Sequence, residues 1–217
     1  MRPGAKQFFE RRGAPTPPAL PYDAEVKWLE STGTQYIDTG IVGSDSLIIN
    51  AAWEYGSSDA SCPPFGCRTS ATNRALAITG WFETLDNRLY LNYGSASNWL
   101  LQTTIQLYGH RWGVHVENGG CLLYCDGESV VINNRRQSQF STVSQMILFG
   151  FHDSGTGTNT LSRNVRIFSW DVQSNGVLIQ SLVPVRIGNE GAMYDKVSGQ
   201  LFRNAGTGAF LYGPDKS

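Results

Sequence analysis

The chain has 217 residues, of which 16% are charged, 12% are aromatic and 24 are glycine, and its net charge is -1. A near-neutral chain excludes a nucleic-acid binder with a dominant basic face, and a hydrophobic fraction of 41% excludes wholesale disorder. No stretch approaches the roughly 18 apolar residues that a membrane span needs, so we expect a soluble protein.

The first 21 residues differ in composition from the rest of the chain. They hold five of the nine prolines, and four basic residues against one acidic residue. The local charge is therefore +3, and the remainder of the chain carries -4. No apolar run of signal-peptide length follows this basic start, so we expect no secretory signal. Residues 1–24 are predicted to form an N-terminal tail with a proline-rich spacer.

Two interpretations of this tail are open. In the first it is a disordered segment. In the second it is a docking peptide, in which Phe8, Phe9, Arg11 and Arg12 contact a partner and the proline-rich spacer holds the following domain away from it.

From Glu25 onward the sequence has the pattern of β-structure. Strand-like runs recur about every 8 to 15 residues between clusters of Gly, Asn, Asp and Ser. The predicted strands cover residues 35–39, 46–55, 75–82, 88–93, 111–117, 121–124, 129–133, 145–151, 164–172 and 177–187. No segment keeps a helical period beyond about two turns. Residues 25–217 are therefore predicted to form one all-β domain, a sandwich of two antiparallel sheets.

Motifs near both ends of this domain are distinctive when taken together. The opening motif is residues 28–40, Trp-Leu-Glu-Ser-Thr-Gly-Thr-Gln-Tyr-Ile-Asp-Thr-Gly. The closing motifs are residues 184–186, 191–195, 199–202 and 204–208, and interior matches lie at residues 65–68 and 148–150. Together they resemble the concanavalin A-like lectin/glucanase domains, of laminin-G type, found in phage virion proteins and in surface proteins of gut bacteria. The resemblance implies a jelly-roll sandwich whose first and last strands lie close together, but no single activity.

Catalytic patterns known for this fold are absent from the sequence. Glycoside hydrolases of this fold carry acid and nucleophile on one strand as Glu-x-Asp-x-(x)-Glu, because residues two apart face the same side. The chain has no Glu-x-Asp, and its nearest pairs, Glu83 with Asp86 and Asp126 with Glu128, are typical of turns. Three histidines are present without a Gly-x-Ser-x-Gly elbow. We predict a non-enzymatic protein, with glycoside hydrolysis as the third-ranked hypothesis.

The four cysteines are Cys62, Cys67, Cys121 and Cys125, and their spacing is unlike that of zinc ribbons. Cys121 and Cys125 lie four apart on a strand, about 13 Å between Cα atoms, which is too far for a disulfide. A Cys62–Cys67 disulfide is the alternative to free thiols. Without a signal peptide we expect free and mostly buried thiols.

We expect neither a cofactor nor a metal. The resemblance leaves one option, a single calcium, which laminin-G-type domains often hold through an Asp and loop carbonyls. The loop from Asp153 to Asn159 is the candidate. It has no second carboxylate, which favours a solvated flexible loop.

A ligand site is predicted where aromatic side chains bracket a polar loop. Sugars stack on aromatic faces and bind Asn, Asp and Arg through their hydroxyls, and residues 93–99 offer Tyr93, Asn98 and Trp99. The competing interpretation is core packing, which we expect for Trp53 and other aromatics within strand-like runs.

These features favour a non-enzymatic phage virion surface protein: a head fibre, a capsid decoration or a receptor-binding module. Its tail would dock on a virion or other assembly protein, its lectin-like domain would bind a host-surface glycan, and a homo-oligomer is compatible with that role. The alternative is a bacterial surface or secreted glycan-binding adhesion module, which usually needs an export signal.

Overall fold

The computed structural model describes residues 19–57, 62–70, 76–83, 86–94, 99–102, 105–117, 120–133 and 141–217. For residues 62, 76–77, 79–83, 86–88, 99–102 and 131–133 it describes the backbone pairing and not the side chains. Phe8, Phe9, Arg11 and Arg12 lie outside these ranges. Within them the chain forms strands and no helix, so no described helix has the length and hydropathy needed to cross a membrane.

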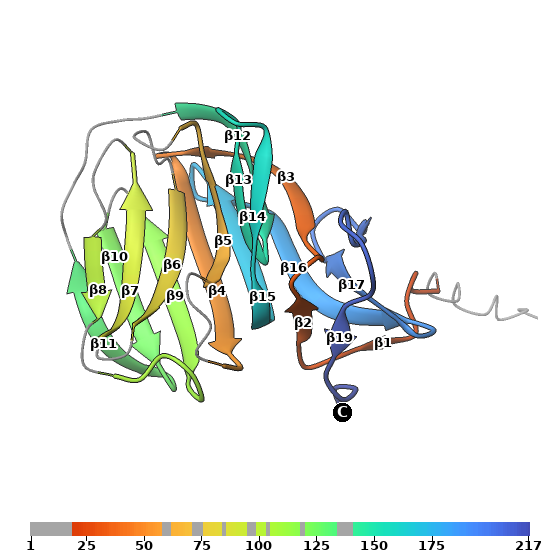
Figure 1. The fold of residues 1–217 in the computed structure, drawn as a ribbon. Coiled ribbons are helices and arrows are strands. Elements are labelled where there is room, and N and C mark those ends of the chain that lie inside the picture. Colours follow the sequence, from red (N-terminus) through yellow and green to blue (C-terminus); the bar gives the residue numbers. More distant parts are fainter. Residues whose placement is uncertain are drawn as a thin grey trace, which may run out of the picture.

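The larger of two sheets contains eleven of the described strands (Figure 1). Its main path runs β11 (Glu128–Asn133), β10 (Gly120–Cys125), β9 (Arg111–Glu117), β4 (Leu47–Tyr55), β15 (Arg163–Ser174), β16 (Val177–Ile187), β17 (Glu190–Asp195) and β18 (Leu201–Phe202). Three short strands join this path: β1 (Ala24–Glu25) on β16, β2 (Leu29–Thr32) on β15, and β19 (Leu211–Tyr212) on β2.

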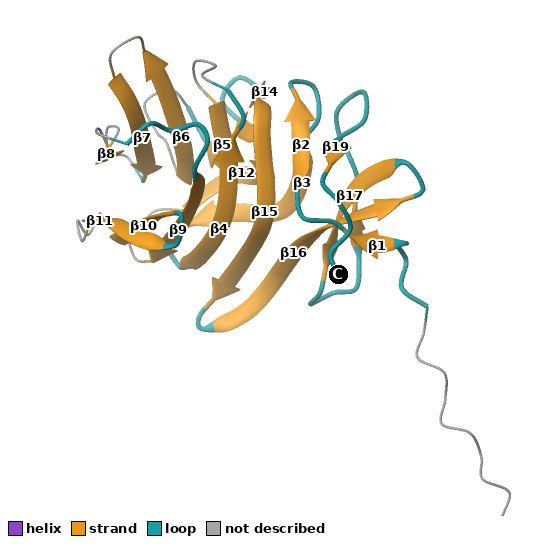
Figure 2. Cartoon of the chain, turned by 90° about the horizontal axis from the view of Figure 1, so that it is seen from below, coloured by secondary structure: helices purple, strands orange, loops and turns teal. Residues whose placement is uncertain are grey.

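The smaller sheet lies against the larger one as a second layer (Figure 2). Its path runs β14 (Thr158–Leu161), β13 (Gly150–Asp153), β5 (Cys62–Arg68), β6 (Leu76–Glu83), β7 (Asp86–Tyr93) and β8 (Trp99–Gln102), and β12 (Ser141–Leu148) pairs with both β5 and β3 (Ile37–Ser44). The predicted all-β sandwich is confirmed. One pairing departs from the predicted antiparallel order, because β13 runs parallel to β5, with His152 opposite Cys67.

The core lies between the two sheets because apolar residues alternate along the central strands. In β4 every second residue, from Leu47 to Tyr55, is buried. Trp53, Trp112 and Trp170 are all fully buried, as expected for aromatics in strand-like runs. The ring centroid of Phe65, from the smaller sheet, lies 4.8 Å from that of Trp170 and 6.3 Å from that of Trp53.

The opening and closing segments of the domain pair with each other at one end of the sandwich (Figure 1). β19 pairs with β2, and the amide of Lys216 donates to the carbonyl of Glu25 at 2.8 Å. The hydroxyl of Thr34 donates to the carbonyl of Thr207 at 2.8 Å. The proximity of first and last strands that the resemblance implied is confirmed.

The predicted strand ranges omit β5, which starts at Cys62 and includes Pro63 and Pro64. The predicted loop bracketed by Tyr93 and Trp99 agrees with the strand bounds, because β7 ends at Tyr93 and the backbone of β8 begins at Trp99, which pairs with Leu91. The expectation of buried thiols is confirmed for three of the four cysteines, because Cys67, Cys121 and Cys125 are buried and form no disulfide.

Candidate functional site

The three residues predicted to bind a sugar do not form a described site. Tyr93 is 1% exposed, and its hydroxyl donates to the carbonyl of Asp45 at 3.3 Å. Its ring therefore belongs to the core and offers no face to a ligand, which corrects the expectation for this residue. Trp99 is described by its backbone pairing alone, and Asn98 lies outside the described residues.

The candidate calcium loop, which joins β13 to β14, does not suit a hard cation. The Asp153 carboxylate accepts a hydrogen bond from Arg68 Nε at 2.6 Å and another from the amide of Gly155 at 3.0 Å. Burial acts to raise the pKa of Asp153, but the hydrogen bond and charge of Arg68 outweigh it and the pKa is lowered. The carboxylate that calcium would need is already neutralised by an arginine.

A cavity of about 450 Å³ opens instead where β9 begins and β10 ends. It is lined by Arg111, Trp112, Gly113, Asp126 and Gly127. The last two form the tight turn into β11, with φ angles of 52° and 90°, and glycine adopts such an angle without steric cost. This turn brings the Asp126 carboxylate back beside the start of β9.

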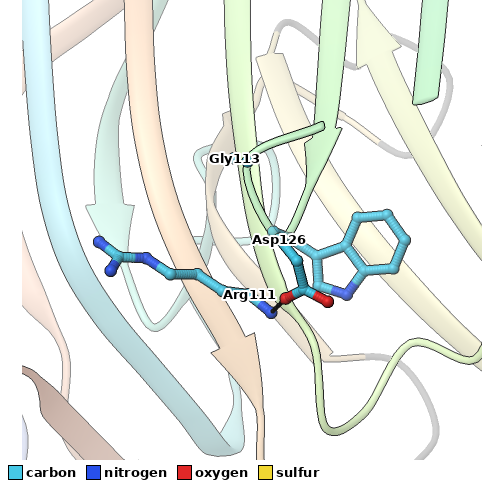
Figure 3. Close-up of a pocket in the computed structure, with 5 residues that line it drawn as sticks. Arg111, Gly113 and Asp126 are labelled. Atoms are coloured by element: carbon cyan, nitrogen blue, oxygen red, sulfur yellow. Dashed lines mark hydrogen bonds between the residues drawn. The ribbon is translucent and has the colours of Figure 1, made fainter. Parts of the chain in front are cut away.

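The Asp126 carboxylate is held by two groups at the start of β9, one from its first residue and one from the residue before it. Oδ1 accepts from the main-chain amide of Arg111 at 2.9 Å, and Oδ2 lies 2.6 Å from Nδ1 of His110. The His110 hydrogen bond is the largest cause of a lowered Asp126 pKa, followed by the Arg111 amide. Figure 3 shows the Arg111 side chain running away from this carboxylate, across the neighbouring strand.

The solvent side of β9 and β10 continues from this cavity as a surface of aromatic and polar groups. Gly113 pairs with Tyr124, and a Cβ built on Gly113 would lie 3.6 Å from the Tyr124 Cβ and 3.8 Å from its Cδ2. The half-buried Tyr124 ring thus lies beside a position without a side chain. Two residues along β9, His115 places Nδ1 2.8 Å from Oδ1 of Asn50 on β4. We call Tyr124, Gly113, His115, Asn50 and Asp126 the β9 surface.

Charged groups border the β9 surface across the larger sheet. The Arg111 guanidinium lies 4.2 Å from the ring centroid of Phe168 on β15. Further along β15, Arg166 contacts Glu30 at 2.6 Å on one side and Glu54 at 3.1 Å on the other. The two carboxylates are therefore both paired with a cation, unlike the free acid and nucleophile of a glycosidase.

One group of side chains at the cavity combines three kinds of metal ligand. His110, Cys125 and Asp126 offer a ring nitrogen, a thiol sulfur and a carboxylate oxygen, all within 4.8 Å of one another. As a nucleophile the thiol is poorly suited, because burial, with the charge of Asp126, raises the pKa of Cys125.

Part of this site could be recognised in the sequence. Asp126 was interpreted as a turn residue, which is correct, and the alternation through Arg111, Gly113 and His115 marks one face of a strand. The sequence could not show that His110 and Asn50 join the same surface, because both contacts depend on pairing register.

Comparisons with known proteins identify the fold. No protein-family model and no curated protein sequence matches the chain. A heptameric SAP-like pentraxin from Limulus polyphemus matches with 12% identity and a TM-score of 0.50, over 70% of this chain and 76% of that one. A putative carbohydrate binding protein from Bacteroides ovatus matches with 9% identity and a TM-score of 0.56, over 89% of this chain. Domains LG4-5 of the mouse laminin alpha1 chain match over 97% of this chain with 13% identity and a TM-score of 0.44.

The chain has the concanavalin A-like lectin/laminin-G fold. It spans 61% of the Bacteroides protein and 51% of the laminin domains. At these identities the likeness concerns the fold, and function has to be argued from the side chains.

Proposed function

We propose that this protein is a non-catalytic, lectin-like module that binds a glycan on the β9 surface. The observation that carries the proposal is the half-buried ring of Tyr124 beside the bare backbone of Gly113. A sugar ring can approach that aromatic face closely, because no side chain at Gly113 stands in the way.

Polar groups on both sides of the Tyr124 ring suit the hydroxyls of a sugar. On one side the Asp126 carboxylate retains acceptor capacity beyond its bonds to Arg111 and His110. On the other side lies the hydrogen-bonded pair of His115 and Asn50, with donor and acceptor groups at the surface. By strand register, the imidazole of His115 lies on β9, beside the strand that carries Tyr124, and the amide of Asn50 lies opposite it on β4. The Asp126 carboxylate follows at the end of the strand that carries Tyr124. A few such polar groups beside an aromatic ring are what ligand sites typically require.

A binding role is further supported by the shared fold of the Bacteroides protein described as a putative carbohydrate binding protein. Three groups do not favour the hydrolase alternative: Glu30 and Glu54 are both paired with Arg166, and the pKa of the Cys125 thiol is raised.

A glycan array tests the proposal. We expect the wild-type protein to bind a defined group of glycans, and Tyr124→Ala to lose at least about fivefold in affinity, because one stacked aromatic ring contributes on the order of 1 kcal/mol or more. Trp99→Ala is the matched variant for the site predicted from sequence, and it should retain binding. A blank array would contradict a glycan-binding role, and loss of binding in Trp99→Ala alone would move the site to the other sheet.

We also propose that the tail docks this module on a larger assembly, such as a phage virion, where it would serve as a fibre, decoration or receptor-binding protein. The support is the resemblance of the end motifs and the +3 charge of residues 1–21, which include the Phe8–Phe9 pair. Deleting residues 1–21 should abolish incorporation into particles while the sandwich stays folded by circular dichroism. A truncated protein that still joins particles would contradict docking, and a chain found on bacterial surfaces would favour the adhesion alternative.

A further inference from the structure

Three chemically different ligand groups meet at the end of the β9–β10 hairpin. His110 precedes β9, Cys125 ends β10 and Asp126 begins the turn that follows. They meet because the strands are in antiparallel register: Cys125 is opposite Trp112, and the amide of Asp126 donates to the carbonyl of Arg111 at 2.8 Å. Two of the three groups are therefore fixed by the backbone of a hairpin.

The spacing of these groups suits one transition-metal ion. The three ligand atoms all lie within 4.8 Å of one another. Around a tetrahedral zinc ion, with bonds of about 2.0 to 2.3 Å, ligand atoms are separated by about 3.3 to 3.8 Å. To bind the ion, the 2.6 Å separation of Nδ1 and Oδ2 has to widen and the longer separations have to shorten. Small rotations of the side chains, chiefly of the half-buried His110, bring about both changes.

Their chemistry selects the kind of ion. Nδ1 of His110 and Oδ2 of Asp126 are 2.6 Å apart, so these two groups already face each other, and a bound ion would replace the hydrogen bond between them. Calcium and magnesium prefer all-oxygen sites, and this group has one carboxylate. Imidazole, thiolate and carboxylate together suit a borderline ion such as Zn²⁺, with Cys125 giving up its proton on binding.

An outer contact already orients one ligand. The second oxygen of Asp126 accepts from the Arg111 amide at 2.9 Å, which fixes the carboxylate plane. Such outer contacts are typical of metal sites, where they hold a ligand in its binding orientation.

We propose that His110, Cys125 and Asp126 bind one Zn²⁺ ion or a similar borderline divalent metal ion, and that water completes the coordination. This metal site and the proposed glycan site bind different ligands, although Asp126 belongs to both.

Cobalt(II) is the spectroscopic probe for this site. Tag-free, chelator-treated protein is titrated with CoCl₂, and ZnCl₂ is then added as competitor. We expect one cobalt ion per chain, visible-region bands of tetrahedral cobalt, a near-ultraviolet thiolate-to-cobalt band, and loss of all of them on adding zinc. The thiolate band reports the sulfur ligand directly, so it does not depend on any activity.

Variants decide which residues bind the ion. Cys125→Ser should lose the thiolate band, and His110→Ala and Asp126→Asn should each weaken binding by at least about tenfold. His152→Ala is the control, because Nδ1 of that histidine is paired with Asn159 at 2.7 Å on the other sheet. His110→Ala removes a partly exposed side chain, so it tests the proposal even if Cys125→Ser fails to fold. Absence of cobalt bands in the wild type, or bands that persist in His110→Ala, would overturn the proposal.

Discussion

The side-chain amide of Gln35 connects the opening and closing segments of the domain, because its Nε2 donates to the main-chain carbonyl of Thr207 at 3.1 Å. Its Oε1 accepts from the amide of Thr32 at 2.7 Å and from the hydroxyl of Ser31 at 3.2 Å. Gln35 is 2% exposed, so these bonds form away from water. The opening and closing motifs are therefore joined by a structural contact, although about 170 residues separate them in the sequence.

Replacing Gln35 with Ala should destabilise the domain by about 1 to 3 kcal/mol, because buried groups on both terminal segments lose a partner. The measurement is the free energy of unfolding in urea. Gln200→Ala is the control, since its side chain is exposed. Equal losses in the two variants would contradict a specific role for Gln35.

Gly206 is expected to tolerate no side chain. A Cβ at this position would collide with the main-chain carbonyl of Thr34 and lie 3.2 Å from Cδ1 of Tyr36. Gly206→Ala should therefore cost about 1 to 3 kcal/mol, measured as a lower urea midpoint. Gly113→Ala is the matched control, because its nearest neighbour would lie 3.6 Å away and alanine loses less backbone entropy than glycine in a strand. A stable Gly206→Ala variant would show that the two segments can separate without cost.

The Arg68–Asp153 pair should contribute to stability in a pH-dependent way. Because the pKa of Asp153 is lowered in the folded state, its contribution is present above the ordinary carboxyl pKa of about 4 and is lost as the pH falls through the folded value. Asp153→Asn should therefore flatten the fall in urea stability between pH 5 and pH 2. A variant whose stability falls as steeply as that of the wild type would contradict this assignment.

Removing the arginine tests the same pair at neutral pH. Arg68→Ala leaves the carboxylate of Asp153, whose side chain is 3% exposed, without its cation and should cost about 3 kcal/mol. Arg203→Ala breaks the exposed ion pair with Glu190 and should cost less than about 1 kcal/mol.

Calcium should not raise the melting temperature of the wild type through the loop from Asp153 to Asn159, and a rise that Asp153→Asn removes would restore the calcium hypothesis.

The buried thiols should be unreactive in the folded protein. Burial raises the pKa of Cys121 to about 12, so almost no thiolate is present at pH 8. Alkylation with iodoacetamide, followed by peptide mass mapping, should leave Cys67, Cys121 and Cys125 unmodified until the protein is unfolded. Rapid labelling of Cys121 in native buffer, or a disulfide to any of the three, would contradict this prediction.

Most strands were predictable because their signals are local. β4, β9 and β16 alternate or are bounded by turn residues, and the observed bounds agree with the predicted ranges to within one or two residues. β5 was missed because Pro63 and Pro64 suggest a loop. Both prolines are tolerated since they pair through their carbonyls, which accept from the hydroxyl of Ser162 and the amide of Phe149.

The candidate site was less predictable because its parts come from distant segments. Asp126 and Gly127 were visible as a turn, and that local prediction is consistent with their positive φ angles. Tyr93 was misassigned because an aromatic residue next to a polar loop looks the same in sequence whether its ring faces the core or the solvent. Only the pairing of β7 within the smaller sheet settles that direction.

The sequence by itself determined an all-β chain, its turns, and the end motifs that resemble concanavalin A-like domains, since alternation and turn chemistry act over a few residues. The tertiary structure decided which groups meet: Gln35 with Thr207, Arg68 with Asp153, and His110 with Cys125 and Asp126. The physical reason is that strand register is set by packing the whole core, and a shift of one residue would turn strand side chains such as those of Arg68, Asp153 and Cys125 to the opposite face.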